Sequence, residues 1–382
     1  MSEFDVNDIK AMNDMNDMNR GIKNVDSICY ASTSLHLLMM IPNLLKHIEE
    51  LINNEDNDND NGYSNDNKYI AVIWQLKQFL NQYYDQLLDE EKNNNADIVI
   101  LCETLAEVEG QDFDEEISRD AVTFSQELLN AINKASSNTK HENSSKLTEI
   151  IGGEFINVYS TECGKRRQNL ESFYFLRLAP TNNIKDFYQA LQEFIKGSSM
   201  KSQWKITKQD DNGTDIIHKE ILDTHYCTRI KRLSDHFFVH LKRFTVDYKT
   251  MSHEKVKSFF SFPIELNMAP FMDSESGSII DSDCIYDLIG IIIHEGDSDD
   301  GHYYVIKNNM NEDYDKRWLL IDDKHVEYFN IENLPNVAFG ENKNGDDDDD
   351  NDDDQSAYLL LYQKTTTNTS LASFSNMVKL YI

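Results

Sequence analysis

The chain has 382 residues, of which 40% are apolar and 10% aromatic, so it can bury a core and is not a wholly disordered protein. Its 68 acidic residues outweigh 36 basic ones, which gives a formal net charge of -32. A surface this acidic repels nucleic-acid phosphates and anionic lipids, so we expect a protein partner, no nucleic acid and no membrane.

Helical spacing of apolar residues dominates the first 150 residues. A polar segment at 1–18 predicts a flexible arm. In the third predicted helix, 112–135, acids in the first turns would suit the helix dipole. The predicted helices are 28–52, with an interruption at Pro42, 70–88 and 112–135.

Two low-complexity segments interrupt these patterns. Residues 53–67 are rich in Asn and Asp, and residues 342–355 contain the run DDDDDNDDD. Charge runs of this kind are typical of solvated loops, so we expect inserts that add little to the core.

From about residue 150 the character changes. Segments rich in aromatic and β-branched residues, bounded by Gly, Pro, Asn or Asp, predict a series of strands. Because helices come first and strands follow, we predict an α+β fold rather than an alternating one.

Five cysteines lie far apart, and the first ten residues lack the basic and apolar regions of a secretory signal. No apolar run approaches the roughly 18 residues of a membrane span. We therefore expect reduced thiols and a cytoplasmic or nuclear location. The cysteines are Cys29, Cys102, Cys163, Cys227 and Cys284.

Cys29 opens a predicted helix after a turn-like segment. The positive end of the helix dipole favours a thiolate there. On position alone, a small buried apolar residue is the commoner interpretation. A reactive cysteine also needs a base and a group that orients the base.

The segments GHYYVIK and RWLLIDD predict a hairpin that closes about residue 312. His302 would then face Asp322, since each lies ten residues from the centre, and both side chains would share a face of the sheet. Asp323 would point to the other face, and a register slip of one residue would exchange the two acids.

Several segments together resemble the ubiquitin-specific protease family. GIKNVDSICYASTSLHLL is similar to its cysteine box, and YDLIGIIIHEGDSDDGHYYVIK followed by WLLIDD to its histidine box and acidic segment. DAVTFSQELL, LKRF with FSFPIEL, and SAYLLLYQK resemble further family motifs, all in family order.

The resemblance implies a papain-like cysteine protease fold with a helical thumb, a β-rich palm and fingers. The catalytic domain would span 19–365, with the thumb at about 20–150, the fingers at about 150–235 and the palm at about 235–364. Residues 366–382 would form a tail.

The resemblance also implies roles for five residues. Cys29 would be the nucleophile, His302 the general base and acid, and Asp322 the group that orients the imidazole. Asn24 would donate to the oxyanion, and Asp323 would be an auxiliary acid.

Four further residues match positions that bind substrate. Asp120 would hold an arginine of the ubiquitin tail through a charge-assisted hydrogen bond. His294, Gly301 and Tyr303 would also contact the tail.

The family resemblance implies a monomeric deubiquitinating enzyme that cleaves after the C-terminal glycine of ubiquitin and needs no cofactor. Because the chain has no CxxC pair, we expect no metal in the fingers. Asp26 and Ile28 depart from the family pattern beside the nucleophile. Two alternatives therefore stay open: a ubiquitin-binding module with impaired turnover, and a scaffold whose acidic inserts recruit basic partners.

Overall fold

The computed structural model describes most of the segments in which elements are predicted. The predicted arm at 1–18, the tail at 366–382, most of the two inserts, Asn24 and Asp26 lie outside the described residues. None of the described helices has the length and apolarity to cross a membrane. The described residues are 21–22, 27–58, 67–88, 98–114, 117–137, 146–209, 215–247, 250, 252–273, 284–298, 301–309, 317–341 and 354–365.

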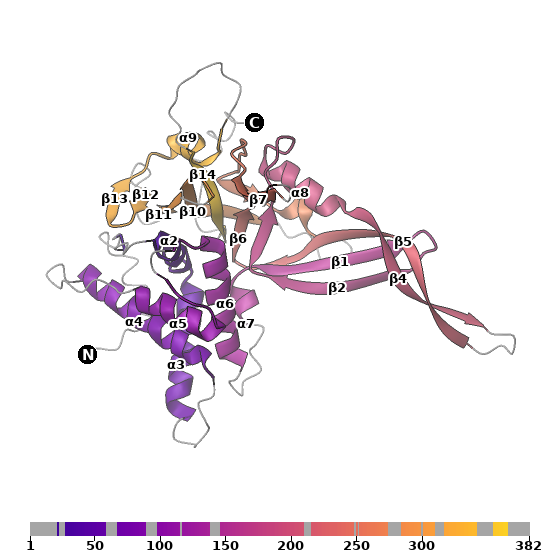
Figure 1. Ribbon diagram of the computed structural model, residues 1–382, viewed down its shortest axis with the longest axis horizontal. Helices are drawn as coiled ribbons and strands as arrows, with labels where there is room; N and C mark the ends of the chain where they lie inside the picture. Colours follow the sequence, from indigo (N-terminus) through magenta and orange to yellow (C-terminus); the bar gives the residue numbers. More distant parts are fainter. Residues whose placement is uncertain are drawn as a thin grey trace, which may run out of the picture.

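The thumb is a group of helices that lies against one face of the large sheet (Figure 1). All ten residues of α2 are buried, because the helix is enclosed by α6 on one side and by strands β10 and β11 on the other. The thumb helices are α2 (Cys29–Leu38), α3 (Pro42–Asp58), α4 (Tyr69–Leu88), α5 (Val99–Glu109), α6 (Ala121–Ser137) and α7 (Lys146–Ile150).

The palm is a mixed sheet with strand order β13-β12-β11-β10-β14-β6-β3, and β9 also pairs with β10. Its central strands are apolar on both faces, because thumb residues cover one face and a second buried cluster covers the other. The strands are β3 (Phe175–Leu178), β6 (His236–Leu241), β9 (Glu265–Asn267), β10 (Ile285–Gly296), β11 (Gly301–Asn308), β12 (Trp318–Asp322), β13 (His325–Tyr328) and β14 (Ser356–Lys364).

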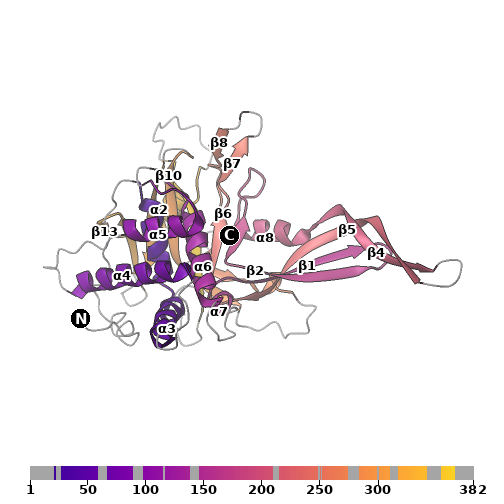
Figure 2. The same ribbon diagram turned by 60° about the horizontal axis from the view of Figure 1, so that its bottom comes forward.

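Short elements complete the palm. The hairpin of β7 and β8 projects from it beside β10 (Figure 2). These elements are β7 (Phe244–Asp247), β8 (Ser252–Lys255), the 3-10 helices Ala269–Phe271 and Ile331–Asn333, and α9 (Leu334–Ala338).

The fingers are an antiparallel sheet with strand order β2-β1-β5-β4 that extends away from thumb and palm (Figures 1 and 2). Helix α8 packs at the root of this sheet. The elements are β1 (Gly153–Thr161), β2 (Arg166–Phe173), α8 (Phe187–Lys196), β4 (Ser198–Gln209) and β5 (Asp215–Leu233). Strand β3 falls within the range predicted for the fingers but pairs with β6 in the large sheet.

The predicted start of the third helix is wrong. Helix α6 begins at Ala121 and has no acid in its first turn, so the acids at 112–116 precede it. Asp120 instead acts as a cap, since its Oδ1 accepts the Thr123 N–H at 2.7 Å. Helix α8 was not predicted, although Asp186 caps it in the same way by accepting from Gln189.

The predicted hairpin register is also wrong, by two residues. Val305 pairs with Ile321 and Lys307 with Leu319, so the hairpin is centred on residue 313 rather than 312. A shift of one residue on the opposite arm exchanges the two faces, but a shift of two preserves them. The apolar pattern therefore cannot distinguish these two registers.

The finger sheet curls until its two edge strands touch. Arg167 on β2 lies with its guanidinium 4.7 Å from the ring of Tyr159 and 4.7 Å from the ring of Trp204 on β4. It also donates to the Gln203 carbonyl at 3.1 Å and to Ser202 Oγ at 2.6 Å. The buried Trp204 is thus enclosed by a residue from the opposite edge of the sheet.

We expect Arg167→Met to lower the free energy of unfolding by about 1–2 kcal/mol, because it removes two cation–π contacts and two hydrogen bonds at a partly solvated site. Urea unfolding followed by tryptophan fluorescence measures this change. Arg166→Met is the matched control, since Arg166 lies on the opposite face of the same strand. Equal midpoints for the two variants would show that Arg167 does not hold the edges together.

Candidate active site

Cys29 is the first residue of α2, and its thiol lies where the thumb meets the palm. The residue at the cap position is Ile28, whose side chain cannot accept a hydrogen bond from the first N–H groups of the helix. The positive end of the helix dipole is therefore not offset by a cap, and it acts on the cysteine. Cys29 is only 3% exposed. A buried position fits a small apolar core residue as well as a nucleophile, so the role of Cys29 depends on the side chains around it.

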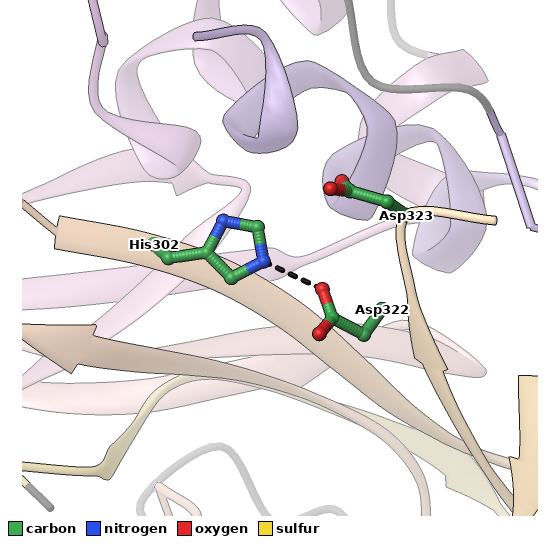
Figure 3. Close-up of side chains that lie close together, drawn as sticks. All are labelled: His302, Asp322 and Asp323. Atoms are coloured by element: carbon green, nitrogen blue, oxygen red, sulfur yellow. Dashed lines mark hydrogen bonds and ion pairs between the residues drawn. The ribbon is translucent and has the colours of Figure 1, made fainter. Parts of the chain in front are cut away.

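His302 is the partner of that thiol. It stands at the start of β11, and its Nε2 lies 2.6 Å from Asp322 Oδ1 (Figure 3), which leaves Nδ1 available to the thiol of Cys29. The bond to the thiol, and then the bond to Asp322, raise the pKa of His302 from 6.5 to about 10 against the opposing effect of burial. Folded His302 binds its proton more tightly than His302 in the unfolded chain, and this difference stabilises the fold. The contribution is complete below pH 6.5 and is lost as the pH rises through about 10.

Two adjacent acids end β12, and the imidazole is bonded to the first of them. Asp322 is the last residue of the strand, and it reaches His302 along a diagonal of the sheet rather than straight across. Asp323 begins the next turn with φ of 51°, a left-handed conformation that aspartate tolerates better than most residues. The predicted contact is present although the predicted register is wrong.

The segment before Cys29 passes close to this acidic turn. A Cβ on Gly21 would lie 1.9 Å from the Asp323 carbonyl oxygen, so only glycine fits there without displacing the backbone. The first residue of the cysteine segment therefore contacts the turn that carries the acids. Asn24 and Asp26 lie between these points and outside the described residues, so the oxyanion role of Asn24 stays a prediction.

His294, Gly301 and Tyr303 lie together beside the base. A Cβ on Gly301 would lie 2.2 Å from His294 Nε2, so glycine permits the imidazole to pack against the strand. Burial, reinforced by Lys255 and His302, lowers the pKa of His294 to about 3. His294 is thus a neutral packing group, with its ring 4.8 Å from the ring of Tyr303.

Asp120 lies near the same aromatic rings. One carboxylate oxygen caps α6, and the other accepts a hydrogen bond from the Tyr358 hydroxyl. Each oxygen of an ionised carboxylate has two acceptor positions, so Asp120 retains capacity for a ligand's N–H groups. Its role in binding an arginine stays a prediction.

Two aromatic residues of the site carry no role in the sequence analysis. The rings of Phe244 and Tyr358 are 5.1 Å apart, and those of Phe244 and His294 are 4.9 Å apart. Tyr358 also packs against Tyr303 at 5.7 Å. Both residues occur in family-like motifs, LKRF and SAYLLLY, so a signal existed, but the strand pattern accounted for them as core.

One group of described side chains has the donors for a metal ion. Ligand atoms of His302, Asp322 and Asp323 lie within 4.8 Å of one another. A cation bound there would compete with the hydrogen bonds of His302 to Cys29 and Asp322. These residues therefore fit an acid–base role better than metal ligation. In the fingers, Cys163 is exposed in the turn between β1 and β2, whereas Cys227 is buried on β5.

A concavity of about 850 Å³ lies away from this chemistry, between α6, the root of the finger sheet and α8. Its lining mixes amide, charged and aromatic side chains. They include Gln126, Asn130, Glu171, Phe173, Arg177 and Arg232. It is large enough to receive part of a protein surface rather than only a reacting group.

Comparisons with known proteins give a consistent result. A family model described as ubiquitin carboxyl-terminal hydrolase matches residues 20–362. Human ubiquitin carboxyl-terminal hydrolase 34 is 27% identical over 343 residues, which cover 84% of this chain and 9% of that protein. Mouse ubiquitin carboxyl-terminal hydrolase 9Y is 22% identical over 379 residues, which cover 84% of this chain and 14% of that protein. The chain thus spans a small part of these relatives.

Solved structures agree on the fold. A structure described as the SAGA Ubp8/Sgf11/Sus1/Sgf73 DUB module bound to ubiquitin aldehyde is 19% identical, with a TM-score of 0.61. The match covers 92% of this chain and 70% of that chain. The predicted α+β class is confirmed.

We expect Asp322→Asn to lower the pKa of His302, because the imidazolium loses the carboxylate that accepts its proton. Asp323→Asn should change that pKa less, since the hydrogen bond goes to Asp322. NMR titration of the imidazole carbon resonances in both variants measures the difference. A larger shift in Asp323→Asn would assign the orienting role to Asp323.

Proposed function

Because the chain belongs to the ubiquitin carboxyl-terminal hydrolase family, we propose that it is a deubiquitinating cysteine protease. It would hydrolyse the thioester, ester or isopeptide bond after the C-terminal glycine of ubiquitin. The observation that carries the proposal is the His302 imidazole, which is hydrogen-bonded to Asp322 and whose pKa is raised mainly by the nearby Cys29 thiol. A nucleophile, a base and an orienting group are thereby brought together.

The arrangement supports a two-step reaction. The Cys29 sulfur attacks the glycine carbonyl, and protonated His302 gives its proton to the leaving amine, which leaves a thioester on the enzyme. Water then attacks the thioester while His302 accepts its proton, and the sulfur departs. Asp322 stabilises the imidazolium in both steps. Asn24 remains our proposed donor to the oxyanion.

The surroundings of the site support a route for the ubiquitin tail between thumb and palm. The buried rings of His294, Tyr303 and Tyr358 pack together beside Gly301 and would form the wall beneath this route, and Gly301 adds no side chain to it, which suits a tail that ends in glycine. Asp120 stands at this wall and could accept N–H groups from an arginine of the tail. The concavity at the root of the fingers would receive part of the ubiquitin body.

We propose ubiquitin and ubiquitinated proteins as partners, and a monomer that acts without nucleic acid or membrane. The net charge of -32 supports the last two points. A cytoplasmic or nuclear location is part of the proposal.

A ubiquitin probe with a C-terminal electrophile should label the protein at Cys29, because the aligned thiolate attacks it. Intact-mass and peptide mass spectrometry measure the product. Cys29→Ser should give neither labelling nor hydrolysis of a fluorogenic ubiquitin amide. Wild-type protein that binds ubiquitin but is not labelled would instead be a binding module.

Asp120→Asn should weaken ubiquitin binding, because an amide lacks the charge that pairs with an arginine. The dissociation constant is measured by calorimetry in a Cys29→Ser background, so that turnover does not interfere. Deletion of the acidic run 346–353 is the control. Those acids should matter less, because exposed charges beyond about 8 Å are screened at physiological salt. If only the deletion weakens binding, Asp120 does not hold the tail.

A further inference from the structure

Lys255, the last residue of β8, bonds to three backbone carbonyls in two segments that are far apart in the sequence. Its Nζ donates to the His294 carbonyl at 2.9 Å and to the Gly296 carbonyl at 2.8 Å. It also donates to the Asp354 carbonyl, just before β14. Because β8 pairs only with β7 among the described strands, these bonds join the β7–β8 hairpin to the palm.

The chemistry of this contact matches an ammonium group. A protonated lysine has three N–H donors and no acceptor, and here three carbonyl oxygens surround it. A neutral amine would offer two donors and turn a lone pair towards the third carbonyl. Lys255 can therefore donate a hydrogen bond to all three carbonyl oxygens only when its amine is protonated.

Lys257 is nearby but makes different contacts. Its Nζ pairs with the Asp354 carboxylate and lies 3.4 Å from an Asp297 carboxylate oxygen. These are side-chain ion pairs at a half-exposed position, whereas Lys255 bonds main-chain atoms. Replacing Lys257 removes a local positive charge, whereas replacing Lys255 removes both a charge and the hydrogen bonds to the backbone. A comparison of the two variants therefore isolates the effect of the backbone contacts.

Two of the three carbonyls held by Lys255 belong to the end of β10, which pairs with the start of β11 beside the base. Gly296 pairs with Gly301 across the β10–β11 turn, directly before His302. The His294 imidazole fills the space that a side chain at position 301 would need. Movement of the end of β10 would therefore move the start of β11 with it.

We propose that Lys255 is a positioning residue of the active site: its ammonium group holds the end of β10 against the β7–β8 hairpin and thereby keeps His302, at the start of the paired strand β11, beside Cys29. The proposal rests on the proposed function, because the displacement matters only if His302 serves as the base. No role in substrate contact is assigned to Lys255.

The surrounding charges set the pH range in which this contact operates. Burial is the main cause that lowers the pKa of Lys255 from 10.5 to about 8. Asp354 and Asp297 oppose that effect, whereas Arg243 and Lys257 add to it, and the neighbouring His294 is neutral. The three-donor form thus predominates below about pH 8 and is lost above it.

The test compares Lys255→Met with Lys257→Met in the full chain, using a fluorogenic ubiquitin amide. We expect Lys255→Met to lower kcat by about 10- to 100-fold, the effect of misplacing a catalytic group by about 1 Å, with KM changed less than about twofold. Lys257→Met should stay within about threefold of wild type, because it keeps the three hydrogen bonds of Lys255 to the backbone carbonyls. Equal losses in the two variants would overturn the proposal.

The pH profile distinguishes positioning from a general loss of structure. Wild-type kcat should decline as the pH rises through about 8, before the decline that follows deprotonation of His302 near 10. Lys255→Arg should move the first decline to higher pH, because a guanidinium stays protonated. A wild-type profile that is flat up to pH 9 contradicts the proposal even if Lys255→Met does not fold.

A second measurement needs no ubiquitin. The rate at which iodoacetamide alkylates Cys29, followed by peptide mass spectrometry at pH 6, reports the thiolate that His302 stabilises. We expect a slower rate in Lys255→Met than in Lys257→Met. Wild type that hydrolyses no ubiquitin substrate refutes the proposed function, whereas unchanged alkylation in Lys255→Met refutes only the positioning role.

Discussion

The site depends on the close packing of one buried helix against the central strands of the palm. Helix α2 has no exposed residue, and Gly290 lets it approach β10 so closely that an added Cβ would lie 2.4 Å from Leu37. Cys29 belongs to this helix and His302 to the neighbouring strand β11. The distance between nucleophile and base is therefore set by the core, whose packing density resists small displacements.

The sequence reveals the residues of the site better than it reveals how they are held. Cys29, His302 and Asp322 carry chemistry in their side chains, and their motifs identify them. A two-residue register error left their contact intact, because the faces of a strand repeat every second residue. Lys255 escaped notice because its partners are main-chain carbonyls, which have no residue-type signature. The start of α6 did carry a signal, because Asp120 is a favoured cap residue, but the acids before it fit a first turn equally well.

A different kind of information is missing for the fingers. Strand composition predicted a sheet there, but curvature arises from twist accumulated over long strands and is not visible in a short pattern. The contact of Arg167 with Trp204 joins strands at opposite ends of the strand order. Arg167 is held there by two aromatic rings and two hydrogen-bond acceptors. The family resemblance directs attention to paired cysteines instead, so it does not point to this contact.

The closure of the finger sheet also bears on how the protein avoids self-association. Edge strands β2 and β4 carry backbone groups that could template pairing with another chain, and the nearby Ile217 and Ile221 are more than 60% exposed. Arg167 and Lys165 occupy the carbonyls of Gln203 and Lys205 on β4 and leave cationic groups along that rim. A strand from another molecule would have to displace the side chains of Arg167 and Lys165 from these carbonyls before it could pair with β4. The curl of the sheet thus also protects the fingers from aggregation.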